Sequence, residues 1–224
     1  AGAPMAPVPG SLKFAGVLPR LLAYWLDGFL VSIASLLVGL VIAAVVGLPN
    51  LFATDGSSLA ALSSTSALIN VVLELGLTFL YFVGFWTSAG RATPGMRLFH
   101  IQIGQAADGR ALTVSQAALR WVALGTPISA LAIVPVIGGL SGLISVVWSL
   151  VLFVSTATSD SRRGVHDNIA GTALVAPVGN EGPVVPCLVL FVLLLVVLPI
   201  IAVVALMAVA GQVVTILSQV GTSI

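Results

Sequence analysis

The stretch LLAYWLDGFLVSIASLLVGLVIAAVVGL, residues 21–48, carries a single charged residue, Asp27. A helix needs about 20 apolar residues to cross the ~30 Å hydrocarbon core of a bilayer. A helix that is apolar on every side is typical of a membrane span or a deeply buried core. Because this stretch exceeds the length that a span needs, it predicts a membrane-spanning helix.

Two other stretches predict further spans. Residues 67–88 are apolar apart from an acid, Glu74. Residues 183–211 are apolar as well and contain Pro199, where we expect a kink. Both stretches are long enough to cross a bilayer as single helices.

Residues 121–157 are also apolar, but Pro127, Pro135 and the pair Gly138 and Gly139 interrupt them. This pattern predicts two short helices joined by a tight turn. At about 1.5 Å per residue the first of these helices would reach ~24 Å, which is short of a full crossing. A re-entrant or tilted hairpin and two complete passes therefore remain alternatives. With two passes, the sequence predicts an all-α membrane protein, a bundle of about five membrane segments.

Composition excludes several classes of protein. Hydrophobic residues make up 59% of the sequence and charged residues 7%, against roughly 25% charged residues in soluble domains. The polar segments are too short for a separate soluble domain, which needs on the order of 50 residues. The net charge is +1 and the cations form no runs, so we expect no nucleic-acid partner. The single cysteine, Cys187, excludes an intramolecular disulfide and a CxxC motif.

The positive charges predict the orientation in the membrane. All eight precede the first span, lie between the second span and residue 121, or follow residue 157; they are Lys13, Arg20, Arg91, Arg97, Arg110, Arg120, Arg162 and Arg163. Loops rich in Lys and Arg face the cytoplasm. With five passes, this predicts a cytoplasmic N-terminus and an outside C-terminus.

A short segment between the second span and residue 121 has a different period. Leu98, His100 and Gln102 alternate with Phe99, Ile101 and Ile103. Asp108 and Gly109 then offer a turn before residues 111–114. This pattern predicts a small cytoplasmic β-hairpin on the membrane surface. Thr113, with a glutamine three residues later, predicts a cap for the helix that follows.

Three polar motifs stand out against the apolar background. They are LPRLLAYWLDG at residues 18–28, GRATPGMRLFHIQI at residues 90–103 and RRGVHDNIAGT at residues 162–172. In this order and spacing, over residues 12–178, they resemble the RDD family of bacterial membrane proteins. Met96 stands where this family usually has a lysine.

The resemblance implies a domain organisation, a set of site residues and a location. It implies an RDD-like membrane domain at residues 13–178, between a flexible arm at 1–12 and an additional C-terminal transmembrane helix at 183–211, with a tail at 212–224. The residues that name the family would be Arg20, Asp27 and Asp167. The resemblance also implies the bacterial cytoplasmic (inner) membrane.

Arg20 and Asp27 are seven residues apart, which places them on one helix face, separated by ~10 Å. A carboxylate this far into hydrocarbon costs on the order of 2.5–3.5 kcal/mol, so we expect Asp27 to face the interior and to find a cation or stay protonated. We hypothesise a buried cluster of Arg20, Asp27 and Asp167 that exchanges a proton or a cation. The alternative is an ion network that locks helix ends together.

Three further residues are secondary candidates. Arg120 is another available cation on the same side. Glu74, in the outer half of the second span, is either a second station on an ion path or an acid bonded to a neighbouring Ser or Thr. His166 either titrates near neutral pH or is a surface side chain that orients Asp167 or caps a turn.

Other kinds of site are not expected. Two histidines with no cysteine near them predict no metal site. The sequence contains no nucleophile with its base, no phosphate loop and no cofactor motif, so we expect neither an enzyme nor a bound cofactor.

Two functions fit these observations. The resemblance implies an ion or small-solute transporter, for which one copy offers few polar groups, so it would act as a homo-oligomer in the lipid bilayer. The alternative is a non-catalytic accessory or structural subunit that packs against a larger membrane protein complex.

Overall fold

The computed structural model describes residues 12–42, 44, 56–134, 137–179, 182–197, 200, 201, 203, 204 and 207. The chain divides into two compact units, Ala1–Gly182 and Pro183–Ile224. In the second unit, Val184–Val197 forms an apolar helix. The first unit contains all the elements described below.

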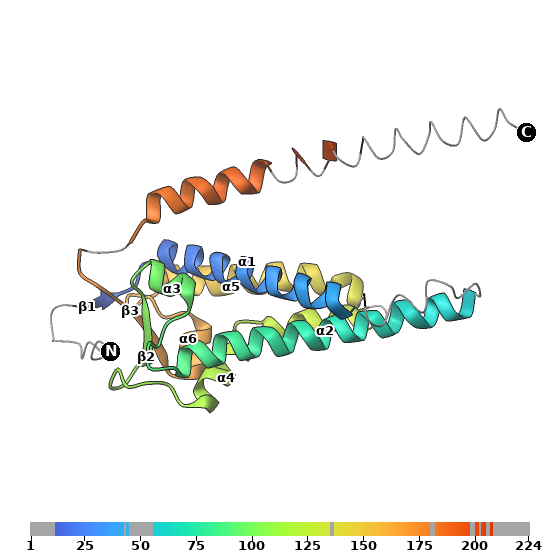
Figure 1. The fold of residues 1–224 in the computed structure, drawn as a ribbon. Helices are drawn as coiled ribbons and strands as arrows, with labels where there is room; N and C mark the ends of the chain where they lie inside the picture. Colours follow the sequence, from blue (N-terminus) through green and yellow to red (C-terminus); the bar gives the residue numbers. More distant parts are fainter. Residues whose placement is uncertain are drawn as a thin grey trace, which may run out of the picture. The chain divides into compact units, whose positions relative to one another are not determined.

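Three long helices dominate the first unit: α1 (Val17–Ile42), α2 (Gly56–Thr87) and α5 (Ser141–Thr158) (Figure 1). On α1 the buried side chains Ala23, Asp27 and Val31 recur every four residues, so they form one inward face. Large apolar side chains such as Leu36 and Leu40 are exposed on the other faces. This distribution is compatible with a lipid environment rather than with water.

Among the described residues, three helices are long and apolar enough to cross a bilayer: Val17–Ile42, Leu68–Thr87 and Gly138–Thr158. The first two confirm the predicted helices, although α2 begins at Gly56, earlier than predicted. The predicted kink at Pro199 lies outside the described residues. The count of five membrane segments is not confirmed.

The segment 121–157 differs from the prediction in its first half. Helix α4 (Val114–Ala123) ends where Gly125 takes a left-handed φ of 83°, and a 3₁₀ helix, η3 (Thr126–Ile133), follows. A short 3₁₀ turn, η4 (Gly138–Leu140), then leads into α5. At about 2.0 Å per residue η3 extends ~16 Å, which is too short to cross a bilayer by itself. The first of the two predicted helices is therefore a 3₁₀ segment, and the second is α5.

A three-stranded antiparallel sheet joins distant parts of the sequence. The central strand, β3 (Thr172–Pro177), pairs with β1 (Leu12–Phe14) on one side and with β2 (Gln102–Gln105) on the other. Ile103 lies opposite Leu174 in this register. The sheet therefore brings the N-terminal segment and the last motif of the unit to the same place.

The predicted β-hairpin is wrong. Leu98 is the last residue of a short helix, α3 (Pro94–Leu98). This helix begins here because Thr93 caps it and Pro94 suits its first position. Residue 111 begins no strand, and β2 finds its partner in β3. The predicted cap at Thr113 is confirmed, since its side chain accepts the N–H of Gln116 at 3.2 Å.

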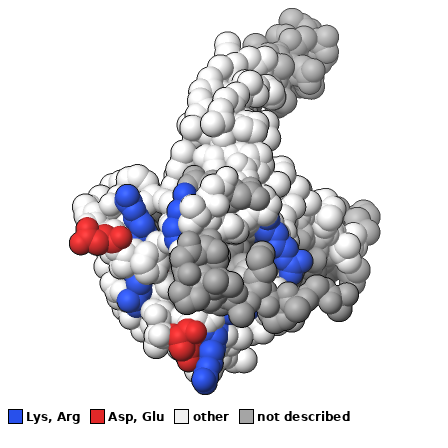
Figure 2. All heavy atoms as spheres, turned by 90° about the vertical axis from the view of Figure 1, so that its left-hand side faces the viewer, with Lys and Arg blue, Asp and Glu red and all other residues white. Residues whose placement is uncertain are grey.

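The sheet, α3, α4 and α6 (Val165–Ala170) gather at one end of the three long helices (Figure 1). Phe99, Ile101 and Ile103 are each 1% exposed and form a small core there. Figure 2 looks onto this end and shows Lys and Arg at several separate places on the face. We call this end of the unit the polar end.

Candidate functional site

Asp167 binds two arginines at the polar end. Arg20 Nη1 lies 3.1 Å from Asp167 Oδ2, and Arg120 Nη1 contacts Asp167 Oδ1. The hydroxyl of Thr172 donates to Oδ1 at 3.1 Å, and the N–H of Gly164 donates to Oδ2 at 3.3 Å. Asp167 is completely buried. We call Arg20, Arg120, Asp167 and Thr172 the arginine clasp.

The clasp ties together elements that are far apart in the sequence. Arg20, in the first turn of α1, also donates to the carbonyls of Arg162 at 2.6 Å and Leu174 at 3.2 Å. Arg120, in the last turn of α4, donates to the Thr172 hydroxyl at 2.6 Å and lies over the Trp86 ring at 5.3 Å. One carboxylate therefore joins α1, α4, α6 and β3.

Burial and the charges of the clasp together shift the pKa values of Asp167 and His166 on α6. Burial raises the pKa of Asp167, but the neighbouring positive charges, Arg120 first, outweigh it and hold that pKa below its usual range. Burial, and then the charge of Arg120, lower the pKa of His166 to about 4. His166 is buried, with Nε2 at 3.5 Å from Asp167 Oδ2, so the predicted surface position is wrong. The imidazole is neutral at neutral pH.

Asp27 is 1% exposed, yet it has quite different partners. Its Oδ1 accepts the Tyr81 hydroxyl at 2.7 Å and the N–H of Gly95 at 2.8 Å. Its Oδ2 accepts the Thr93 hydroxyl at 2.5 Å. Among the described residues, no salt bridge joins Asp27 to a Lys or Arg. We call Asp27, Tyr81, Thr93 and Gly95 the Asp27 network.

The start of α3, which supplies two of these donors, lies directly against α1. A Cβ on Gly95 would lie 2.8 Å from Asp27 Oδ1 and would also meet the carbonyl of Ala23. A side chain at this position would therefore push α3 away from α1. The glycine of the TPG motif allows the backbone N–H to reach the carboxylate.

The structure divides the predicted cluster of Arg20, Asp27 and Asp167. It brings Arg20 and Asp167 together, adds Arg120 as a second arginine, and places Asp27 in a separate network. In the described part of the chain, no three His, Cys, Asp or Glu side chains come together as a group that could hold a metal ion.

Sequence reasoning missed three hydroxyl groups. Thr93 and Thr172 lie inside two of the quoted motifs and are both completely buried, so their places in those motifs were a usable signal. Tyr81 gave a weaker signal. A tyrosine in an apolar span must find a partner for its hydroxyl, but the sequence does not say which one.

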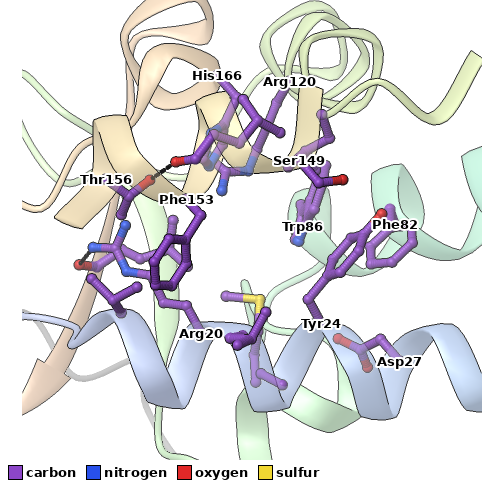
Figure 3. Close-up of a pocket in the computed structure, with 17 residues that line it drawn as sticks. Arg20, Tyr24, Asp27, Phe82, Trp86, Arg120, Ser149, Phe153, Thr156 and His166 are labelled. Atoms are coloured by element: carbon purple, nitrogen blue, oxygen red, sulfur yellow. Dashed lines mark hydrogen bonds between the residues drawn. The ribbon is translucent and has the colours of Figure 1, made fainter. Parts of the chain in front are cut away.

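A cavity of about 320 Å³, the inner cavity, lies beside both groups. Arg20, Asp27, Arg120 and His166 are among the residues that line it, whereas the enclosed Asp167 is not. Figure 3 shows Arg20 and Asp27 along α1, with Arg120 and His166 across the cavity. Asp27 is therefore the aspartate that a small ligand in this cavity can reach.

Glu74 lies elsewhere. It lines a second cavity, of about 430 Å³, together with Tyr24, Thr78 and other residues. Neither arginine of the clasp lines this second cavity. Glu74 is thus separated from the predicted cluster.

Comparison with known proteins gives one match. A family model described as the RDD family matches residues 14–171, a range that includes the Asp27 network and most of the clasp. No curated protein and no solved structure matches the chain.

Proposed function

Since this chain belongs to the RDD family, we propose that it is a small membrane transporter that exchanges protons for cations at Asp27. The observation that carries the proposal is the set of donors around this carboxylate. Asp27 is buried in a helix that is long and apolar enough to span a bilayer, it lines the inner cavity, and its three donors are neutral. Buried acids inside membrane segments commonly mark ion or proton pathways.

The Asp27 network can accept a proton without losing a partner. A hydroxyl group both donates and accepts, so a proton on Oδ2 could be donated to Thr93 while the Thr93 hydroxyl turns away. The ionised form instead leaves a negative charge beside the inner cavity, where a cation can balance it. One carboxylate cannot hold both at once, so proton and cation compete for it.

The clasp has a different role in this proposal. Asp167 is held by two guanidinium groups, which donate but cannot accept, so a proton there would oppose both arginines. We assign the clasp to holding α1, α4 and α6 in place around the inner cavity. This is the structural role that was the alternative interpretation of the predicted cluster.

The same proposal includes a location and an orientation. All eight Lys and Arg residues lie in segments of the polar end, which favours a cytoplasmic polar end in a bacterial inner membrane. The N-terminus would be cytoplasmic. The C-terminus would be outside if the chain crosses five times. Because only 7% of the residues are charged, we propose that a homo-oligomer is the working form.

Flux in reconstituted vesicles tests the proposal. With a proton gradient across the vesicle membrane, the unaltered protein should exchange protons for Na⁺ or K⁺. Asp27→Asn should reduce the exchange to the level of empty vesicles, because an amide cannot ionise. The control Asp108→Asn changes an exposed aspartate paired with Arg110 and should leave the flux unchanged.

Two results would count against transport. Full flux in the Asp27→Asn protein would exclude exchange at this carboxylate. An unaltered protein that carries no ion under any gradient, and that co-purifies with a larger assembly in mild detergent, would favour the accessory-subunit function.

A further inference from the structure

The second cavity, which we call the deep cavity, lies between α1, α2, η3 and α5. Its lining includes Glu74 and six Ser or Thr residues, and no Lys, Arg or His among the described residues. Along α2, Thr78 and Glu74 lie ~14 Å and ~20 Å from the helix end at Thr87. The deep cavity therefore lies farther from the polar end than the arginine clasp.

Three of these six hydroxyl protons are already in use. The hydroxyls of Thr78, Ser129 and Ser145 donate to backbone carbonyls of their own segments, at 2.7 Å, 3.0 Å and 2.9 Å. A hydroxyl has one proton, so each of these oxygens has only lone pairs left for a ligand. Ser35 Oγ and Thr126 Oγ1 are buried and have no hydrogen-bond partner among the described residues. Together with the Glu74 carboxylate, the lone pairs of these hydroxyl oxygens make the deep cavity rich in oxygen acceptors.

We propose that the deep cavity binds an alkali-metal cation between the carboxylate of Glu74 and the hydroxyl oxygens around it. Oxygen ligands suit hard cations. One carboxylate balances one positive charge, whereas Ca²⁺ takes six to eight oxygen ligands, usually with several carboxylates. Glu74 is exposed in the structure, on a helix that is long and apolar enough to span a bilayer. In hydrocarbon an unbalanced charge is costly, which favours a monovalent ion here.

Two aromatic side chains separate this site from the inner cavity. Tyr24 and Phe82 line both cavities, and their rings are stacked, with centroids 5.6 Å apart and planes at 18°. A cation that passes from one cavity to the other would therefore pass this pair. Passage of a cation between Glu74 and Asp27 rests on the proposed function and deepens it. The cation site at Glu74 rests on the deep cavity alone.

Equilibrium binding of ²²Na⁺ to the full chain in detergent tests the site without requiring flux. The Asp27→Asn protein should keep saturable ²²Na⁺ binding, which removes Asp27 as the source of the signal. Adding Glu74→Gln should weaken this binding by at least about tenfold, because the balancing charge is lost.

A matched pair of threonines on α2 provides a second variant and its control. Thr78→Val removes a lining oxygen while keeping the side-chain shape, and should weaken binding by roughly three- to tenfold. Thr87 makes the same kind of bond, donating to the Val83 carbonyl at 2.7 Å, but lines neither cavity. Thr87→Val should therefore leave binding unchanged.

The outcomes separate this inference from the proposed function. Binding that survives Glu74→Gln and Thr78→Val but disappears with Asp27→Asn would overturn the deep site and leave exchange at Asp27 intact. Binding that depends on Glu74 in a protein that carries no flux would support the site and overturn the transport function. The absence of saturable ²²Na⁺ binding in every version would overturn the site.

Discussion

Asp27 and Asp167 are both buried carboxylates close to the polar end, but they differ in the groups that hold them. The partners of Asp167 include two guanidinium groups, which always donate. The partners of Asp27 are two hydroxyls and one backbone N–H. Hydroxyl groups can reverse their direction, whereas guanidinium groups cannot.

This difference separates a structural acid from one that can exchange its proton. Protonation of Asp167 would leave two buried arginines without a full counter-charge, which is costly. Protonation of Asp27 requires only that one hydroxyl turns. Burial alone therefore does not identify a functional carboxylate, and the chemical type of its donors is more informative.

The largest expected effect is at Asp167. Asp167→Asn places an NH₂ group against an arginine and leaves two cations uncompensated, so we expect a loss of about 3–5 kcal/mol in the free energy of unfolding. Thermal unfolding in detergent measures this loss. Asp108→Asn is the matched control, because Asp108 pairs with Arg110 at the surface, where such pairs contribute about 0–1 kcal/mol. Equal effects of the two changes would contradict the role of the clasp.

A smaller loss is expected at Gly95, on the Asp27 side of the comparison. Gly95→Ala places a Cβ 2.8 Å from Asp27 Oδ1, so α3 must move and its N–H must leave the carboxylate. Overpacking of this kind costs roughly 1–3 kcal/mol. Gly84→Ala on α2 is the control, since, apart from its chain neighbours and the backbone of its own helix, no atom lies within 4 Å of its Cβ position. An unchanged melting temperature for Gly95→Ala would mean that α3 can shift away from α1 at no cost.

The sequence predicted the parts of the fold that depend on local patterns. Long apolar runs predicted α1 and the membrane part of α2, and the Thr113 pattern predicted the start of α4. The sheet was missed because the partner of β2 is β3, about 70 residues later, and period alone does not identify a distant partner. Pro127 indicated an interruption of the apolar stretch 121–157, but not that a 3₁₀ helix would form there.

The candidate site was predictable only in part, because local patterns mark residues but do not identify their distant partners. The motifs marked Arg20, Asp27 and Asp167 as buried charges, but charge alone did not assign the pairs. Both Arg20 and Arg120 bind Asp167. Arg120 reaches it because α4 packs against α6. The hydroxyl of Tyr81, 54 residues from Asp27, supplied a partner that no local pattern marks.

A pH-dependent effect should appear on the Asp167 side of the comparison. The pKa of His166 is about 4 in the folded protein, against 6.5 for a free histidine, so the unfolded chain binds more protons between these values. Stability should therefore fall as the pH drops from about 6.5 towards 4, by on the order of 1–2 kcal/mol between pH 7 and 5. His166→Gln should flatten this part of the unfolding profile, whereas His100→Gln, which retains His166, should keep it. An unchanged slope in His166→Gln would show that other groups cause the loss.

The smallest effect on stability is expected from Asp27→Asn, and it is the sharpest test of the comparison. In the variant, the amide oxygen can keep the Tyr81 and Gly95 donors, and the NH₂ group can donate to Thr93 Oγ1 once the threonine hydroxyl turns. We therefore expect a change of at most about 1 kcal/mol, the size of one hydrogen bond. Thermal unfolding of Asp27→Asn and Asp167→Asn, measured side by side, gives the difference directly. A loss at Asp27 as large as the loss at Asp167 would mean that the Asp27 network requires a fixed negative charge, and exchange at this carboxylate would then be untenable.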